Sequence, residues 1–162
     1  MELRHTENGS HYETVGKIWG SDAKIKIFTE GEKEASLDTI IARIERILAM
    51  IPKRDETAEL LKSAGIIDRA EEWVSECEPA DDYSDEHERF VIEKGITVEL
   101  PITVEQFAEG LTVESLGVTI EDSAENFSAT VYLLCTPDYF DKHTVAFTID
   151  KDGEMRCLGI SG

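Results

Sequence analysis

The chain has 162 residues, of which 41% are hydrophobic and 31% are charged. This is the length of one ordinary domain, with enough apolar material to form a core, and it argues against global disorder. Asp and Glu number 35 against 16 Lys and Arg, so the net charge is -19 at pH 7. Because a surface this negative repels phosphate backbones and anionic lipids, neither nucleic acid nor a membrane is expected as a partner.

The sequence lacks the patterns of export and membrane insertion. Its first residues, MELRHTENGSHYETVGK, hold no apolar run of a signal peptide, and no later stretch approaches the ~18 consecutive apolar residues of a membrane span. A cytoplasmic location is therefore expected. Cys77, Cys135 and Cys157 are widely spaced and form no CxxC pair, so we expect reduced thiols rather than disulfides or zinc ligands.

Two segments of alternating polarity predict a β-hairpin over residues 11–30. The turn formers from Gly20 to Asp22 join its two strands. In the second strand Ala23, Ile25 and Ile27 share one face, which is typical of a sheet with one buried and one solvated side.

From residue 36 to residue 77 the apolar spacing becomes helical. Ser36 is the expected N-cap of the first helix, and Pro52 is its expected end. Gly65 leaves open whether the remaining stretch is one helix or two. The apolar residues of the first helix are expected to form one buried face: Leu37, Ile40, Ile44, Ile47, Leu48 and Ile51.

Residues 78–89 show neither helical nor strand periodicity and are expected to form an acidic loop. The segment 90–162 is expected to be mostly β, with RFVIEKGITVELPI as its first strand. One short helix interrupts it, opened by a capping box of Thr103 and Gln106 and ended by Gly110. The DKDG sequence predicts the turn between the last two strands.

These elements together predict one α+β domain over residues 1–162. Its architecture is expected to be an antiparallel sheet with two or three helices packed on one face. The sequence contains neither an internal repeat nor a linker long enough to separate two domains.

The strongest charge bias lies in EEWVSECEPADDYSDEHE, which holds nine acidic residues and no Lys or Arg. This segment is either a solvated surface that keeps the protein soluble or a docking patch for a basic protein. Trp73 shares the apolar helix face, so Tyr83 is the better candidate for an exposed anchor. The docking hypothesis assigns these partner-binding residues: Glu76, Glu78, Asp81, Asp82, Tyr83, Asp85, Glu86 and Glu88.

We expect no enzyme activity, cofactor or metal site. The segment TPDYFDKH places Asp138, Asp141 and His143 close in sequence, a set that suits general acid–base chemistry. A turn built on Pro137 and Asp138 explains the same residues without chemistry. The DKDG turn lacks the later glycine and glutamate of a calcium loop, and GxxxxGK, GxGxxG and GxSxG are absent.

The C-terminal pattern DYFDKHTVAFTID, then KDGE and a strand ending in LGISG, after a helix of the TVEQF type, resembles small bacterial families of unknown function. Some of these are immunity proteins of polymorphic toxin systems. The resemblance implies a cytosolic protein that binds and neutralises a toxin domain, often a basic nuclease, and it supplies no catalytic residues. Where those families often have Gly-His, this chain has Lys142 and His143.

The leading functional hypothesis is therefore a binding protein, most concretely an immunity protein that blocks a basic toxin through its acidic surface. The alternative is a housekeeping bacterial domain with a structural or regulatory role. A small hydrolase that uses Asp138, Asp141 and His143 ranks third. The sequence leaves the partner's identity and the oligomeric state open.

Overall fold

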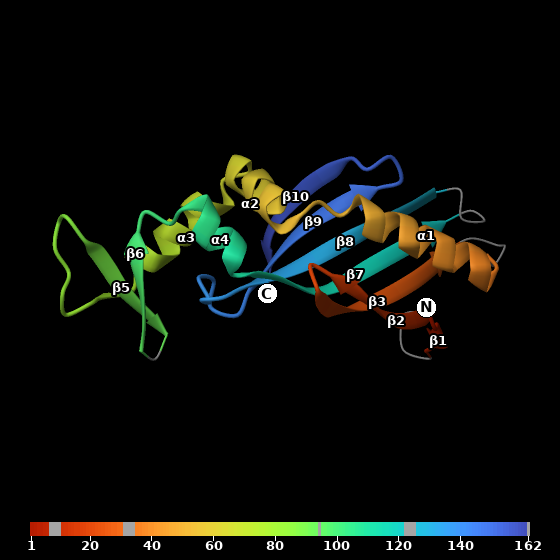
Figure 1. The fold of residues 1–162 in the computed structure, drawn as a ribbon, viewed down its shortest axis with the longest axis horizontal. Coiled ribbons are helices and arrows are strands. Elements are labelled where there is room, and N and C mark those ends of the chain that lie inside the picture. The colour runs from red at the N-terminus through yellow and green to blue at the C-terminus, as the bar shows by residue number, and fades with distance from the viewer. Residues whose placement is uncertain (7–10, 31–34, 94, 122–125, 162) are drawn as a thin grey trace. The chain divides into compact units, whose positions relative to one another are not determined.

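The protein has the α+β class expected from the sequence, with more strands than predicted (Figure 1). The computed structural model describes residues 1–6, 11–30, 35–93, 95–121 and 126–161. Within these ranges the elements are β1 (Arg4–His5), β2 (Tyr12–Ile18), β3 (Ser21–Glu30), α1 (Leu37–Met50), α2 (Arg54–Ser63), α3 (Ile66–Ser75), β4 (Glu78–Pro79), β5 (Glu88–Glu93), β6 (Ile96–Leu100), α4 (Val104–Glu109), β7 (Leu111–Glu121), β8 (Asn126–Cys135), β9 (Thr144–Asp150) and β10 (Met155–Ser161).

The predicted N-terminal hairpin is confirmed as the antiparallel pair of β2 and β3. Its turn is tight, because Ser21 already pairs with Ile18. Trp19 and Gly20 both have positive φ values, 52° and 79°, which is the geometry that two-residue hairpin turns favour. The Trp19 indole Nε1 donates a hydrogen bond to the carbonyl oxygen of Pro52 at 2.9 Å, so the turn is tied to the chain beyond α1.

Helix α1 begins and ends where the sequence predicts. The Ser36 hydroxyl accepts a hydrogen bond from the backbone N–H of Thr39 at 3.2 Å, which satisfies one of the free donors of the first turn. At the other end Ile51 has φ -63° and ψ 122°, the extended conformation that a following proline favours.

The buried face of α1 is narrower than predicted. Ile40, Ile44 and Ile47 are fully buried, whereas Leu48 and Ile51 are half-buried. The prediction was wrong for Leu37, which is 51% exposed. Helical spacing places it with the core residues, but it is the first residue of the helix, where little of the chain covers it.

The larger sheet has seven strands in the order β1-β2-β3-β7-β8-β9-β10. It is mixed, and the prediction of an antiparallel sheet was wrong at one pair: β3 and β7 run parallel, with Lys24 beside Ser115 and Glu30 beside Glu121. Parallel neighbours need a long crossover connection, and here residues 31–110 provide it. Alternating polarity within each strand carries no information about this pairing.

The chain divides into two compact units. Unit 1 consists of Met1–Pro52, Val113–Leu133 and Ala146–Leu158, and unit 2 consists of Lys53–Thr112, Leu134–Val145 and Gly159–Gly162. The single domain expected over residues 1–162 stays a prediction.

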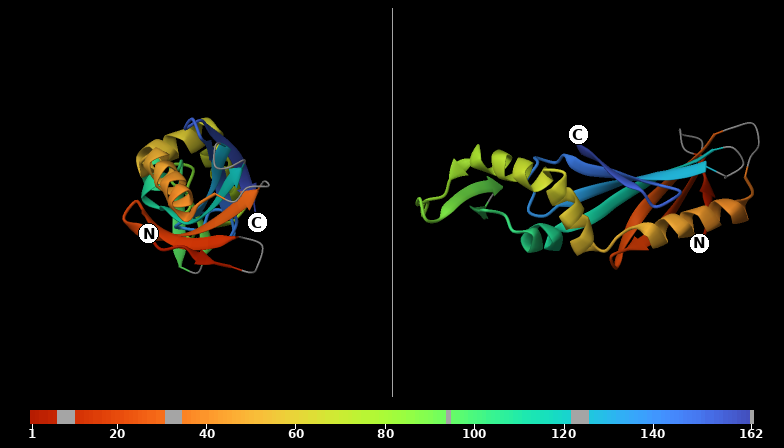
Figure 2. Two further views of the ribbon diagram at one scale, coloured as in Figure 1. Left: turned by 90° about the vertical axis from the view of Figure 1, so that its right-hand side faces the viewer. Right: turned by 90° about the horizontal axis from the view of Figure 1, so that it is seen from above.

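In unit 1, α1 covers one face of the sheet (Figures 1 and 2). The guanidinium groups of Arg43 and Arg46 lie over the Phe127 ring, 5.3 and 5.6 Å from its centroid. Gly16 of β2 leaves room for Leu48 of the helix, whose Cδ1 lies 3.3 Å from where a Cβ atom would stand. The apolar strand faces beneath the helix form the core of this unit.

In unit 2, α2 packs against α3 and α4. Gly65, with φ 83°, separates α2 from α3, so the helical segment 36–77 contains three helices. The predicted capping box of α4 is confirmed: the Thr103 hydroxyl accepts from the Gln106 N–H, and the Gln106 side chain accepts from the Thr103 N–H, both at 3.1 Å. None of the helices in the described ranges is long and apolar enough to span a membrane.

A three-stranded sheet, in the order β4-β5-β6, belongs to unit 2. The segment expected to form one strand, RFVIEKGITVELPI, is instead the antiparallel hairpin of β5 and β6, with Phe90 opposite Val98. Gly95, with φ 77°, lies between the two strands. A glycine free to adopt this left-handed conformation allows the reversal that the continuous apolar pattern conceals.

The turn predicted between the last two strands is confirmed at Asp150 to Gly153. The Gly153 N–H donates to the Asp150 carbonyl oxygen at 3.0 Å. The Asp150 side chain accepts hydrogen bonds from the N–H groups of Asp152 and Glu154, both at 2.9 Å. An aspartate that caps its own turn in this way is a common device of tight hairpins.

Candidate functional site

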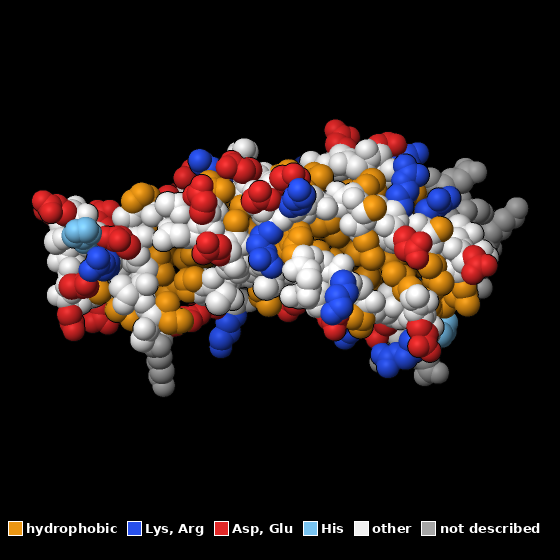
Figure 3. Space-filling model, viewed as in Figure 1, with side chains coloured by type: hydrophobic (Ala, Val, Ile, Leu, Met, Phe, Trp, Pro, Cys, Tyr) orange, Lys and Arg blue, Asp and Glu red, His pale blue; other side chains and the backbone are white. Residues whose placement is uncertain are grey.

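All eight residues predicted to bind a partner are exposed in unit 2. Glu76 follows α3, Glu78 lies in β4, and Glu88 begins β5. The remaining five lie in the connection between these two strands: Asp81, Asp82, Tyr83, Asp85 and Glu86. Figure 3 shows acidic side chains gathered over β5 and β6.

The acidic segment is more regular than the loop predicted over residues 78–89, because both of its ends belong to strands. Ala80 N–H donates to the Arg89 carbonyl oxygen at 2.9 Å, which closes the β4–β5 connection. Within it, Ser84 and His87 exchange two backbone hydrogen bonds of 3.1 Å. These bonds order the backbone that carries the acidic side chains.

Two of the carboxylates in this region are engaged in ion pairs. The Arg89 guanidinium bonds to Asp82 and lies 3.7 Å from Glu99, and the His87 Nδ1 lies 2.6 Å from a Glu99 oxygen. The hydrogen bond with Asp82 and the charges of Asp82 and Glu99 raise the pKa of Arg89. These groups are exposed, so the pairs fix side-chain positions rather than contribute much stability.

The other six predicted carboxylates, those of Glu76, Glu78, Asp81, Asp85, Glu86 and Glu88, form no ion pair with any described residue. Their negative charge is not compensated by a neighbouring cation within the part of the chain that the structure describes. This leaves a net field that attracts positively charged molecules.

A groove of about 420 Å³ runs beside these carboxylates. Its apolar part is formed by Pro79, Ala80 and Val91, the last of which is 37% exposed. Its acidic rim is formed by Glu78, Asp81 and Asp82, and Thr97 completes the lining. The groove therefore combines a partly exposed apolar side chain with three acidic ones.

The two aromatic residues considered as anchors differ in position. Tyr83 is 40% exposed and rests edge-on against Phe90, with the ring centroids 5.5 Å apart. Trp73 instead packs against Phe140 and His143, with centroid distances of 5.6 and 5.4 Å. Tyr83 is therefore partly exposed, and Trp73 mainly serves the packing of unit 2, as its helical spacing indicates.

The sequence-based prediction of the site missed the groove. Val91 and Thr97 belong to the stretch that was predicted as one strand, and Arg89 and Glu99 face each other across the β5–β6 pair. Only a hairpin brings these residues beside the acidic segment. Gly95 is the sequence feature that could have indicated this hairpin.

The second candidate cluster, Asp138, Asp141 and His143, is held by backbone groups. Asp138 accepts from the N–H groups of Phe140 and Lys142 at 3.3 and 2.7 Å. The His143 Nδ1 lies 2.6 Å from the Phe140 carbonyl oxygen and 3.1 Å from that of Asp141. These contacts build the turn that the alternative interpretation of the sequence predicted.

This turn also explains the environment of Cys135. Burial, together with the charge of Asp138, raises the pKa of the Cys135 thiol to about 12. Burial and the neighbouring Cys135 likewise raise the pKa of Tyr139 to about 12. Both groups are therefore neutral at physiological pH, and a neutral thiol is a poor nucleophile.

The three cysteines are free thiols. Among the described residues, no three His, Cys, Asp or Glu side chains gather in a way that would hold a metal ion. The abundance of carboxylates in unit 2 thus reflects a spread of charge along a surface rather than convergence on a point.

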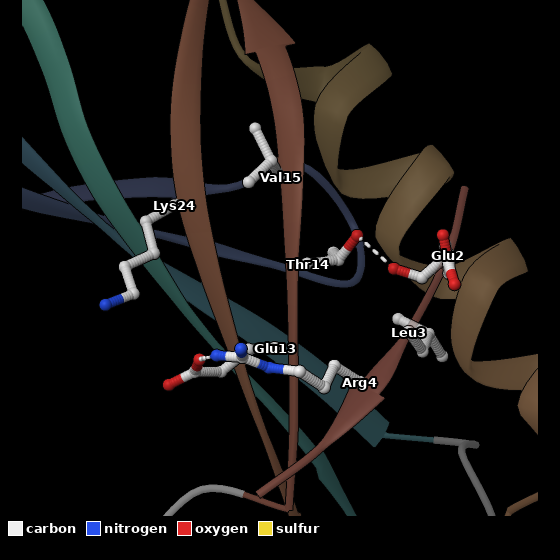
Figure 4. A pocket seen from close by; sticks show the side chains of 7 residues that line it. All are labelled: Glu2, Leu3, Arg4, Glu13, Thr14, Val15 and Lys24. Atoms are coloured by element: carbon white, nitrogen blue, oxygen red, sulfur yellow. Dashed lines mark hydrogen bonds and ion pairs between the residues drawn. The ribbon is translucent and has the colours of Figure 1, made fainter.

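Unit 1 has a pocket of about 630 Å³ beside the short strand β1 (Figure 4). Its polar groups bond to one another: Arg4 donates to Glu13, and the Thr14 hydroxyl donates to the Glu2 carbonyl oxygen, both at 2.7 Å. The hydrogen bond from Arg4 lowers the pKa of Glu13. These pairs engage Arg4, Glu13 and the Thr14 hydroxyl, and Glu2, Leu3, Val15 and Lys24 complete the lining.

No curated protein and no solved structure matches the chain significantly. Residues 2–160 match a family described as an uncharacterized protein conserved in bacteria (DUF2262). Since this match spans nearly the whole sequence, the chain belongs to that bacterial family.

Proposed function

We propose that this protein binds a basic protein partner through the acidic surface of its three-stranded sheet, as a cytosolic immunity protein that neutralises a toxin domain. The observation that carries the proposal is the combination of six carboxylates that form no ion pair with a described residue and an adjacent groove partly lined by apolar residues. Each feature is common alone. Together they supply both the steering charge and the desolvated contact that protein association needs.

The distribution of charge supports a partner site in unit 2. This unit contains 19 acidic and 7 basic residues, a net charge of -12, whereas unit 1 contains 16 and 9, a net charge of -7. A field of one sign raises the rate at which an oppositely charged protein reaches the surface. The partner favoured by this field carries a cluster of Lys and Arg.

The immunity hypothesis adds a reason for such a partner. A nuclease domain needs a basic surface to bind the phosphate backbone of its substrate. An acidic protein surface has the same sign of charge as that backbone and can cover the same basic surface of the nuclease. The C-terminal sequence pattern that resembles immunity families is consistent with this role.

The partner for the test is the product of a reading frame directly upstream of the gene, if it encodes a toxin. Its association with the protein is measured for the triple variant Asp81→Asn, Asp85→Asn, Glu86→Gln. Asp82 is kept, because it holds Arg89. At about 0.01 M salt, where the Debye length is about 30 Å, we expect the association rate to fall about tenfold. At about 1 M salt, where that length is about 3 Å, wild type and variant should differ little.

A matched variant, Glu56→Gln, Glu59→Gln, Asp68→Asn, removes the same charge from exposed positions on α2 and α3. It should slow association less, because these side chains lie outside the acidic segment. Equal slowing by both variants would mean that net charge alone matters. An unchanged rate in the first variant at low salt would contradict a partner site at this surface, and melting curves check that each variant folds.

A further inference from the structure

Strand β6 is an outer strand of the three-stranded sheet, and the direction of its backbone groups follows from the ladder. Ala80 N–H donates to the Arg89 carbonyl oxygen, so the backbone groups of Arg89 face β4. Successive residues of a strand direct these groups to opposite sides. Phe90 therefore faces β6, where it lies opposite Val98.

The neighbours of Val98 must face the other way. The N–H and C=O groups of Thr97 and Glu99 point away from β5, along the outer edge of the sheet, where no described strand pairs with them. Such an edge is a template for one more strand. The opposite edge is less suitable, because β4 has two residues and one of them, Pro79, has no N–H to donate.

A groove of about 420 Å³ follows this edge. Three consecutive residues of β6, Thr97, Val98 and Glu99, line it. Since their side chains alternate between the two faces of the sheet, a space that touches all three lies along the edge of the strand rather than on one face. The opposite wall comes from α4, through Gln106 and Glu109.

The lining of the groove determines which segment fits. It includes Glu99 and Glu109 and no Lys or Arg. Glu99 is already paired with His87 and Arg89, so Glu109 is the acidic residue that can attract a basic segment. Glu109 is exposed and forms no ion pair with a described residue. Ile102 and Tyr139 add buried apolar surface. An extended segment that alternates basic and apolar residues would match both features, since cross-strand neighbours lie on the same face.

We propose that the basic partner inserts such an extended segment into this groove as a fourth strand, paired through its backbone with Thr97 and Glu99. This mode of binding rests on the proposed function and specifies its contact. Backbone pairing supplies affinity, and the side chains along the groove supply selectivity.

The probe for the test is a synthetic peptide of alternating lysine and valine, added to the full chain. We expect it to bind and to slow amide hydrogen exchange at Thr97 and Glu99, whose N–H groups would enter the new ladder. The variant Thr97→Pro removes one of these donors without removing a bond to β5 and should weaken binding at least about tenfold. A peptide N-methylated at alternate residues has the same charge and should also bind at least about tenfold more weakly.

Three results would overturn the edge proposal: no binding of the peptide, equal binding by its N-methylated form, or binding without protection of Thr97 and Glu99. A fourth result would also overturn it. If a second copy of the chain already occupies the edge, sedimentation of the protein alone shows a dimer, and Thr97→Pro releases the monomer. A melting curve shows whether Thr97→Pro folds. If this variant does not fold, binding of the N-methylated peptide to the wild-type protein tests the backbone pairing instead. None of these results affects the association test of the acidic triple variant. The proposed partner surface is therefore tested separately from the proposed edge pairing.

Discussion

Gly110 ends α4 at a point where the backbone of another segment passes very close. Its carbonyl oxygen accepts a hydrogen bond of 2.8 Å from the Thr136 N–H. A Cβ atom at position 110 would overlap the Thr136 carbonyl oxygen, which is a backbone atom and cannot rotate away. The glycine has φ -90° and ψ -2°, so an alanine would accept the conformation, and only the contact forbids it.

We predict that Gly110→Ala destabilises the protein by about 1 to 3 kcal/mol, the range expected for overpacking. Gly117→Ala is the matched control. There a Cβ atom would lie 3.9 Å from a Phe28 ring carbon, an ordinary contact, and loss of chain freedom in the unfolded state should make the change neutral or slightly stabilising. Urea unfolding measures both, and equal midpoints for the two variants would contradict the close approach at Gly110.

At the scale of single elements, α1 offers the clearest test of packing. Ile44 is fully buried, so Ile44→Ala should lower the free energy of unfolding by about 2 to 5 kcal/mol. Leu37→Ala, on the same predicted face, should cost less than about 1 kcal/mol, because Leu37 is 51% exposed. Chemical denaturation of the two variants checks the difference. If Ile44→Ala unfolds at the wild-type midpoint, α1 does not cover a core.

The elements that were predictable are those with local signals. Ser36 and Pro52 delimit α1 through capping and backbone restriction, and the DKDG turn is closed by its own Asp150. The parallel neighbours β3 and β7 were not predictable, because Lys24 and Ser115 pair across a long stretch of chain and neither strand carries a mark of its partner. Periodicity gives the type of an element, and pairing depends on the whole fold.

The candidate site, like the fold, was predictable from the sequence only in part. Charge bias alone located the acidic segment, and the exposure of all eight predicted residues agrees with the hydrophilic character of that segment. The groove beside Val91 and the outer edge at Thr97 arise from a hairpin that the apolar pattern concealed. Sequence reasoning therefore supplied the charge of the surface but not its shape.

For the whole molecule, we predict that folding is independent of metal ions. The described residues contain no group of three His, Cys, Asp or Glu side chains that could hold a metal ion, so we expect chelation to remove nothing that the fold needs. The melting temperature should be the same with and without a chelator such as EDTA, and addition of calcium or zinc should not raise it. A large drop on chelation would show that the acidic segment or the turn from Asp138 to His143 holds an ion.

The parallel pairing of β3 with β7 has a consequence for the protein while it is being made. The ribosome completes β3 at Glu30, and 80 residues must follow before β7 begins at Leu111. During that interval the nascent chain carries an unfilled edge beside the apolar side chains of Ala23, Ile25 and Ile27, a hazard for aggregation. The lysines that alternate with them, at positions 24 and 26, place charge along the same strand and hinder its pairing with other chains until the proper neighbour arrives.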